Sequence, residues 1–292
     1  MASEGYAHPE FLVETEWLES HLGDGDLRIL DCTVFLHPLP GGDMRAESGR
    51  TAYEQGHIPG AVFADLIDDL SDPDSRLRFT LPSASRFAEA MSRYGVGEGT
   101  RIVLYSTNTP QWAARVWWML RKFGFDDAAV LNGGWKKWMM EGRPTSTEPA
   151  SYPPACFVAR PRPGLFVDKD AVRQSMTDGD KIIVNALTLE QHRGTGGNDY
   201  GRAGHIPGSV CVPTRSLLDP ETDCFLPAPE LRAIFAEAGV TGDRPVITYC
   251  GGGIAASGDA LALALIGIEN VAVYDASLQE WAKDEALPME IG

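Results

Sequence analysis

The chain has 292 residues, of which 41 are acidic and 25 are Lys or Arg, and its formal net charge is −16 at pH 7. That length leaves room for two domains of ordinary size, and a hydrophobic content of 43% with a charged content of 23% is typical of a globular protein. Because the balance is strongly acidic and no Lys/Arg run interrupts it, the composition excludes nucleic acids and anionic membranes as expected partners.

The five cysteines are odd in number, widely spaced and free of any Cys-x-x-Cys pair. This pattern argues against a disulfide framework and against a zinc site, so we predict no metal, no organic cofactor and a reducing compartment. The N-terminal residues show neither a basic region nor an apolar stretch, and no segment approaches the roughly 18 apolar residues of a membrane span. We therefore predict a cytoplasmic protein with no membrane partner.

Short apolar runs alternate with amphipathic stretches through the first half of the chain. Periodicity predicts strands at 29–30, 62–63, 102–105 and 129–131, and helices over 10–21, 83–94, 110–123 and 135–141. Strands that are apolar throughout and separated by helices are typical of a parallel sheet with helices on both faces. We therefore predict one α/β domain over residues 1–148.

Six prolines and little periodicity mark residues 144–164. This composition is typical of a linker that runs over the surface, which we place at 149–163. The same alternation returns in a second predicted domain, residues 164–292. Its strands are predicted at 182–184, 210–212, 246–249 and 271–274, and its helices over 168–177, 229–238, 255–266 and 278–283.

The two halves are copies of one module. A Gly-His-Ile-Pro-Gly motif at 56–60 recurs at 204–208, and the strand predicted at 102–105 has its counterpart at 246–249. Trp138 in the first half likewise matches Trp281 in the second. Because the landmarks keep their order, this self-similarity indicates a duplicated domain.

Residues 246–256 read Val-Ile-Thr-Tyr-Cys-Gly-Gly-Gly-Ile-Ala-Ala, a strand followed by Cys250, three glycines and the start of an apolar helix. Glycines let backbone N–H groups converge on the sulfur, and a helix beginning near Ala255 directs its positive end to the same place. Both effects favour a thiolate, or an anion held beside it. The alternative, a buried structural cysteine, needs no run of three glycines. We predict that Cys250 is the catalytic nucleophile and that the loop residues contact substrate: Gly251, Gly252, Gly253, Ile254 and Ala255.

Ser106 stands in the first half where the second half has Cys250, and no glycines follow it. A hydroxyl is a much weaker acid than a thiol and would need a general base to attack. We therefore predict that the first domain is catalytically inactive and forms a wall of a cleft whose chemistry belongs to the second.

The tandem Gly-His-Ile-Pro-Gly modules, the linker and the Cys-Gly-Gly-Gly-Ile-Ala-Ala loop resemble the two-domain rhodanese-type sulfurtransferases, the family of thiosulfate and 3-mercaptopyruvate sulfurtransferases. The resemblance implies an α/β fold of two tandem rhodanese-like domains, each a parallel sheet flanked by helices on both faces. It also implies a ping-pong reaction. Cys250 takes a sulfane sulfur from a small anionic donor, becomes a persulfide, and passes the sulfur to a thiophilic acceptor such as cyanide or a thiol.

The cysteine loop departs from both patterns of that family. Thiosulfate-preferring members tend to carry Arg-Lys after the cysteine, and mercaptopyruvate-preferring members Gly-Ser-Gly, whereas this chain has three glycines. Adding Arg-Lys at positions 251–252 is therefore predicted to shift preference toward thiosulfate. Two arginines that family members often carry in the second module are also replaced, by Leu187 and Gln191.

A small anionic donor then needs another cation. Arg193 and Arg202, on the segment 191–204, are the predicted anchors, because a guanidinium matches carboxylate or sulfonate geometry. For either one, a solvated surface arginine is the equal alternative. His57 is predicted to contact substrate because the first domain faces the cleft. The competing interpretation is structural: a histidine repeated in both halves, as His57 and His205 are, more often hydrogen-bonds a turn.

Three other classes fit the pattern less well. A non-catalytic rhodanese-fold protein with a binding or regulatory role would not need the intact cysteine. A cysteine-dependent phosphatase needs an arginine closing the loop, but Ala256 stands at that position. A redox thiol protein would want a resolving cysteine near Cys250, and only Cys211 or Cys224 could approach it in space.

Overall fold

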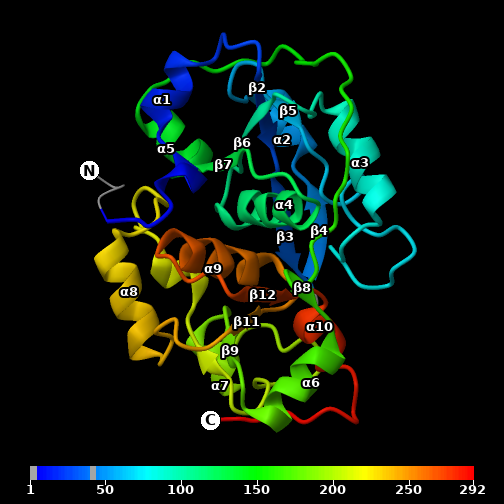
Figure 1. Ribbon diagram of the computed structural model, residues 1–292, viewed down its shortest axis with the longest axis vertical. Coiled ribbons are helices and arrows are strands. Elements are labelled where there is room, and N and C mark those ends of the chain that lie inside the picture. The colour runs from blue at the N-terminus through cyan, green and yellow to red at the C-terminus, as the bar shows by residue number, and fades with distance from the viewer. Residues whose placement is uncertain (1–4, 40–43) are drawn as a thin grey trace.

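The computed structural model describes residues 5–39 and 44–292. Within these residues, each half of the chain forms a five-stranded parallel sheet, and the first half adds a two-stranded antiparallel hairpin (Figure 1). The fold is therefore α/β with two modules, as the sequence predicts.

The first sheet has the strand order β1-β7-β6-β2-β5. Its strands are β1 (Leu12–Val13), β2 (Leu27–Asp31), β5 (Val62–Phe63), β6 (Arg101–Tyr105) and β7 (Ala128–Leu131). Alternate residues of β6 point to opposite faces, so Ile102 and Leu104 pack into one hydrophobic cluster while Val103 and Tyr105 pack into another. Both faces of this sheet are therefore covered.

Helices cover both faces of the first sheet. They are the 3-10 turn η1 (Pro9–Phe11), α1 (Thr15–Ser20), α2 (Arg50–Gln55), α3 (Ala84–Arg93), α4 (Gln111–Lys122) and α5 (Gly134–Met140). Helices α1 and α5 contact each other on one face of the sheet. Their residues Leu18 and Trp138 belong to the same hydrophobic cluster as Val103 and Tyr105. Helix α4 packs on β6 and β7 from the opposite face.

The second sheet repeats this arrangement, with the strand order β10-β9-β11-β12-β8. Its strands are β8 (Phe166–Val167), β9 (Ile182–Asn185), β10 (Val210–Cys211), β11 (Val246–Tyr249) and β12 (Val271–Tyr274). The helical elements are α6 (Lys169–Asp178), α7 (Leu189–Arg193), the 3-10 turn η2 (Thr214–Leu217), α8 (Ala228–Glu237), α9 (Ile254–Leu265) and α10 (Ser277–Trp281).

The two modules share one hydrophobic core. Helices α4 and α9 pack against each other between the two sheets (Figure 1). Trp112 and Val116 of α4 belong to the same cluster of buried residues as Leu261 and Leu265 of α9. Because this cluster is continuous across both modules, the relative position of the first and second modules is set by core packing rather than by the linker.

The chain departs from the predicted helix over residues 10–21. Its first part is instead η1 followed by β1, and only α1 is an α-helix. The reason is tertiary: Leu12 and Val13 pair with Val130 and Leu131 of β7, which ties this segment to the sheet edge. The other predicted helices and strands are confirmed to within one or two residues at their ends, as expected for boundaries drawn from periodicity.

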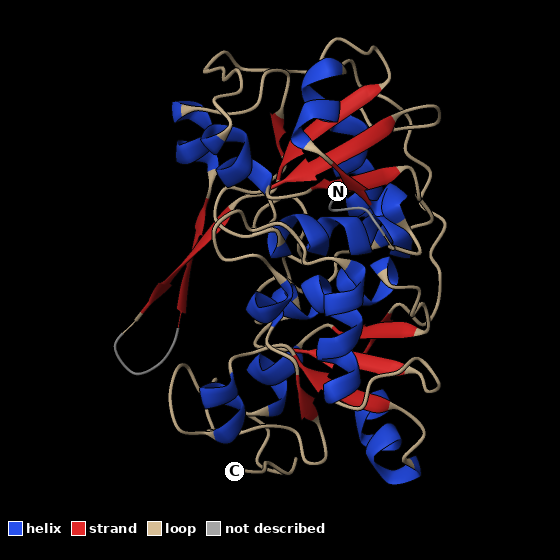
Figure 2. Ribbon diagram, turned by 90° about the vertical axis from the view of Figure 1, so that its left-hand side faces the viewer, coloured by secondary structure: helices blue, strands red, loops and turns tan. Residues whose placement is uncertain are grey.

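Several short elements were not predicted. The largest is a hairpin of β3 (Val34–Pro38) and β4 (Met44–Ser48), which projects from the side of the molecule (Figure 2). Its strands alternate between half-buried and exposed residues rather than forming an apolar run, so an apolar-run criterion misses them. Its residues Leu36 and Met44 nevertheless reach the functional site described below.

The proline-rich segment 144–164 runs along the first module. Ala155 donates a backbone hydrogen bond to Ser92, and Arg160 and Arg162 donate to Phe123 and Lys122. The boundaries at 148 and 164 remain predictions. No helix in the described residues is long and apolar enough to cross a membrane.

Candidate active site

Cys250 lies directly after β11 and ahead of α9, and only 2% of its surface is exposed. Its backbone is held from the start of α10. The N–H of Cys250 donates to Oγ of Ser277 at 3.1 Å, and Leu278 and Gln279 donate their N–H groups to the carbonyls of Cys250 and Gly251. The position of the thiol is therefore defined by two neighbouring β–α turns of the same sheet.

The glycine loop leaves its own N–H groups free. In the described chain, the N–H groups of Gly251, Gly252 and Gly253 have no hydrogen-bond acceptor. Gly253 adopts φ +79° as the N-cap of α9, and an added Cβ would lie 2.8 Å from the carbonyl oxygen of Asp275. Only glycine fits there without strain. These donors and the first turn of α9 can stabilise an anionic sulfur group.

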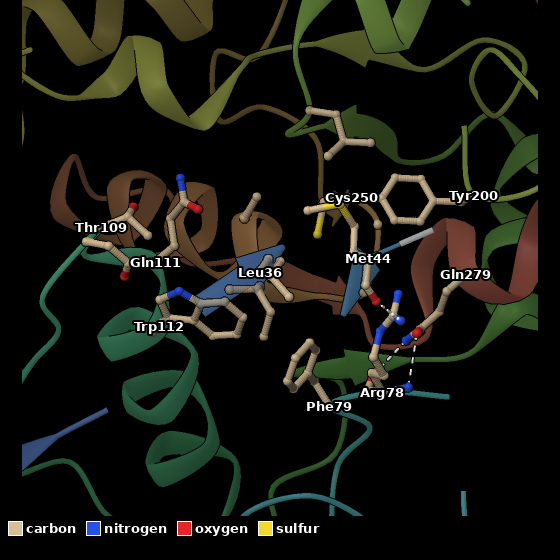
Figure 3. A pocket seen from close by; sticks show the side chains of 16 residues that line it. Leu36, Met44, Arg78, Phe79, Thr109, Gln111, Trp112, Tyr200, Cys250 and Gln279 are labelled. Atoms are coloured by element: carbon tan, nitrogen blue, oxygen red, sulfur yellow. Dashed lines mark hydrogen bonds between the residues drawn. The ribbon is translucent and has the colours of Figure 1, made fainter. Parts of the chain in front are cut away.

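Cys250 opens into a cavity of about 270 Å³ between the two modules (Figure 3). The second module contributes the cysteine loop, and the first contributes the end of the hairpin, the segment before α3 and the start of α4. The lining residues are Leu36, Met44, Arg78, Phe79, Asn108, Thr109, Gln111, Trp112, Leu187, Tyr200, Cys250, Gly251, Gly252, Ile254, Ala255 and Gln279.

Four of the five predicted loop residues line this cavity, namely Gly251, Gly252, Ile254 and Ala255. Gly253 lies behind them, against Asp275 and Arg115. Leu187 is also in the lining, so an apolar side chain faces the cavity where the family often has a guanidinium. The second module itself supplies no cation to the described lining.

Arg78 of the first module is the one charged side chain among the described lining residues. Its backbone is bound on both sides by the amide of Gln279, which accepts from the N–H of Arg78 at 3.0 Å and donates to its carbonyl at 2.7 Å. Its guanidinium donates to the carbonyl of Met44 in β4. Figure 3 shows these contacts beside the cysteine loop. A residue of α10 in the second module, Gln279, therefore positions a cation of the first module.

Tyr200 lies against Gly251. A Cβ atom added to Gly251 would be 2.1 Å from both Cζ and the hydroxyl oxygen of Tyr200. This contact bears on the prediction that Arg-Lys at positions 251–252 would shift donor preference. Any side chain at position 251 requires the Tyr200 ring to move, so the Arg-Lys substitution would displace Tyr200 as well as add charge. The shift toward thiosulfate stays a prediction.

Arg202 does not reach the cavity. Its guanidinium donates to four backbone carbonyls, those of Trp281, Ala282, Asp284 and Leu287, at distances from 2.8 to 3.0 Å. This network joins the segment before the second Gly-His-Ile-Pro-Gly motif to the C-terminal turns. Arg193, at the end of α7, is exposed and is absent from the described cavity lining. Of the segment 191–204 that was expected to supply the anchor, Tyr200 is the residue that lines the cavity.

His57 is buried inside the first module rather than in the cavity. Its Nδ1 is 2.7 Å from the carbonyl oxygen of Tyr53, its Nε2 is 3.1 Å from that of Glu148, and its ring stacks on the Tyr53 ring. His205 repeats this arrangement, with Nδ1 2.7 Å from the carbonyl oxygen of His192 and its ring stacked on His192. This geometry corresponds to the structural interpretation of the repeated histidine and not to substrate contact.

Ser106, the counterpart of Cys250, directly follows β6, and its hydroxyl donates a hydrogen bond to the carbonyl of Thr109. The residues that follow it, Asn108, Thr109, Gln111 and Trp112, line the cavity from the first module. The first module thus contributes a wall to the cavity, as predicted, and its catalytic inactivity stays a prediction.

Sequence reasoning missed Arg78, Tyr200 and Gln279. None lies in a recognisable motif, and Arg78 and Gln279 lie on different modules. A signal was present only for Tyr200, because it falls on the segment 191–204 that was expected near the cleft. Among the described residues, no group of three or more His, Cys, Asp or Glu side chains could hold a metal ion.

Comparison with known proteins gives consistent matches. The sequence pattern of the Rhodanese-like domain matches residues 14–141 and again residues 169–284. The sulfur carrier protein TtuD of Thermus thermophilus is 33% identical, covering 99% of this chain and 99% of its own length. The thiosulfate sulfurtransferase of Rattus norvegicus is 35% identical over 92% of this chain and 91% of its own. Among solved structures, the 3-mercaptopyruvate sulfotransferase SseA of Escherichia coli superposes with a TM-score of 0.80 at 32% identity, covering 91% of this chain and 98% of that one.

Proposed function

This chain belongs to the rhodanese family as a tandem-domain sulfurtransferase, and on that premise we propose that Cys250 carries the transferred sulfur as a persulfide in the cavity between the modules. The observation that carries this proposal is the position of Cys250 within a loop of unpaired N–H donors at the start of α9. A persulfide places negative charge on its terminal sulfur, and burial of that charge without donors would cost several kcal/mol.

The reaction has two halves. In the first, the Cys250 thiolate attacks the transferable sulfur of the donor, and a new S–S bond forms. The S–S bond of thiosulfate or the C–S bond of mercaptopyruvate breaks, and its electron pair leaves with the rest of the donor. In the second, a nucleophilic acceptor attacks the terminal sulfur of the persulfide and the Cys250 thiolate is released. Cyanide would become thiocyanate, and a thiolate would become a persulfide.

Thiosulfate and 3-mercaptopyruvate are the proposed donors, since relatives similar over nearly the whole chain are named for these two reactions. Both are small anions, which suits a cavity of about 270 Å³. With a net charge of −16, the protein as a whole repels anions, so a donor needs a local cation.

Arg78 is the proposed anchor for the donor anion, in place of Arg193 and Arg202. It is the charged residue of the described lining, and Gln279 holds its backbone beside the cysteine loop. Guanidinium geometry matches both the sulfonate end of thiosulfate and the carboxylate of mercaptopyruvate.

We expect Arg78→Gln to raise the KM for either donor by roughly ten-fold or more, because about 1.5–3 kcal/mol of charge-assisted hydrogen bonding is lost. Steady-state kinetics with cyanide as acceptor measures this. Arg193→Ala is the matched comparison, since it removes an exposed guanidinium outside the described lining. An increase in KM for Arg193→Ala with none for Arg78→Gln would restore the sequence-based assignment and contradict the proposal.

The covalent step has a direct test. Incubation with donor alone should add about 32 Da per chain, the mass of one sulfur atom, and cyanide should remove it. Intact-mass spectrometry checks both steps. If neither thiosulfate nor mercaptopyruvate leaves an adduct while turnover proceeds, the persulfide route is wrong.

The absence of nucleic-acid partners and a cytoplasmic location remain predictions from composition. The alternative of a non-catalytic binding or regulatory protein is disfavoured by the intact Cys250 and its open loop.

A further inference from the structure

Tyr200 has a backbone conformation that tyrosine rarely adopts. Its φ is +56°, in the left-handed region, and it is one of few non-glycine residues of the described chain with a positive φ. That conformation costs a residue with a Cβ about 1–2 kcal/mol, and such strain persists where the surrounding structure requires it. Here its consequence is specific: the ring is held over Gly251, beside the nucleophile.

The phenol lies against the cysteine loop and faces the cavity. Its Cζ and hydroxyl oxygen lie where a side chain at position 251 would begin, and Tyr200 lines the same cavity as Cys250 (Figure 3). Burial, with a further contribution from the nearby Cys250, raises the pKa of Tyr200 to about 12. The hydroxyl is protonated at neutral pH, as a phenol with the ordinary pKa of about 10 also is. The side-chain amides of Asn198 and Gln191 lower its pKa through hydrogen bonds, so they stabilise the oxygen and leave its proton to be donated to another acceptor.

The cysteine loop itself offers no side-chain donor, because positions 251 to 253 are all glycine. The amide of Gln279 is already paired with the backbone of Arg78. Apart from Arg78, the other side-chain donors of the described lining are the hydroxyls of Tyr200 and Thr109, the amides of Asn108 and Gln111 and the indole N–H of Trp112. The amide of Asn108 already donates to the carbonyl of Val34, and all of these donors except Tyr200 belong to the first module. Figure 3 shows Tyr200 next to Cys250 and Thr109 at the far end of the cavity.

We propose that the Tyr200 hydroxyl is a second catalytic group, which hydrogen-bonds the carbonyl oxygen of an α-keto thiol donor as the carbon–sulfur bond breaks. This inference rests on the proposed function. When the Cys250 thiolate attacks the sulfur of mercaptopyruvate, the S–S bond forms and the C–S bond breaks. The electron pair moves into the enolate of pyruvate, and the proton of the donor thiol balances the reaction by ending on the methyl carbon. The enolate oxygen is where new negative charge develops, and a donor aimed at that oxygen stabilises the transition state.

Sulfur transfer from thiosulfate needs no hydrogen bond to a carbonyl oxygen. Its leaving group is sulfite, whose oxygens are already anionic in the donor, so no neutral carbonyl oxygen gains charge. Tyr200 therefore distinguishes the two donor classes by chemistry rather than by size.

Tyr200→Phe tests this assignment because the variant keeps the ring over Gly251 and removes only the hydroxyl. With mercaptopyruvate and cyanide we expect kcat to fall roughly 100-fold, the usual loss for one oxyanion donor, while kcat with thiosulfate stays within about three-fold. Tyr274→Phe is the control: its hydroxyl bonds Glu280 and is outside the described lining, so both rates should match the wild type.

The outcomes separate the two proposals. If Tyr200→Phe slows both donors equally, the residue only packs against the loop, and if it slows neither, the hydroxyl is not used; either result overturns the inference while sulfur transfer stands. A wild-type enzyme that uses thiosulfate alone also overturns it. A wild-type enzyme that transfers sulfur from neither donor contradicts the proposed function itself. A solvent deuterium isotope effect on persulfide formation, present for mercaptopyruvate and reduced in Tyr200→Phe, provides a readout that packing would not change.

Discussion

Cys250→Ser is expected to abolish sulfur transfer, with a loss of at least about 1,000-fold in kcat, because an alcohol oxygen is a poor nucleophile at neutral pH and cannot form a persulfide. The substitution is nearly isosteric, and the N–H of position 250 still reaches Ser277. Steady-state assays with each donor and cyanide measure the loss. Intact-mass spectrometry should find no sulfur adduct on the variant.

The exposed Cys156 provides the matched control, since Cys156→Ser changes the same functional group far from α9 in the chain. It should retain most of the wild-type activity. Thermal unfolding of both variants should resemble that of the wild type, because neither substitution removes appreciable packing volume. Residual activity of Cys250→Ser above about 1% of wild type would contradict the assignment of Cys250 as the nucleophile.

The second large effect concerns the junction between the modules. Arg115 of α4 is completely buried, and its Nη2 donates to a carboxylate oxygen of Asp275 and to the carbonyl of Phe79. Asp275, which follows β12, also accepts from the N–H of Leu81 at 2.8 Å. One carboxylate of the second module therefore binds two segments of the first.

We expect Asp275→Ala to lower the free energy of unfolding by about 3 kcal/mol, because it leaves a buried guanidinium without its counter-ion. Nε and Nη1 of Arg115 already have no hydrogen-bond partner in the described chain. Hydrogen bonds from these two atoms therefore do not compensate for the loss of the Asp275 carboxylate. Denaturation with urea, followed by tryptophan fluorescence, measures the change.

Asp126→Ala is the control for Asp275→Ala. It removes another Arg–Asp pair, with Arg162, in which the arginine side chain is 41% exposed and the aspartate side chain 55%. Such a pair contributes at most about 1 kcal/mol, so this variant should unfold close to the wild type. Equal effects of the two substitutions would mean that the Arg115–Asp275 contact is no stronger than a surface pair.

Particular elements show why some of the fold could be predicted and some could not. The strand at 246–249 and the helix after it follow from a short apolar run, three glycines and a long apolar stretch, all local signals. Segment 10–21 has a helical pattern, but Leu12 and Val13 pair as a strand with β7, which lies more than a hundred residues away in the chain. Local periodicity contains no information on such pairing.

The sequence by itself determined the duplication and the α/β class, because both depend on patterns of residues close together in the chain. It also predicted Cys250 as the nucleophile and an inactive first module, from the residues that follow Cys250 and Ser106. Only the tertiary structure decided which residues surround Cys250. Arg78 reaches the cavity because Gln279 of the other module binds its backbone, and Tyr200 does so through a left-handed backbone and a glycine that leaves it room. Arg202 was predicted as an anchor from its chain position, yet four carbonyls hold it elsewhere. A cavity between two modules is formed by contacts between distant segments, and the packing of α4 on α9 brings those segments together.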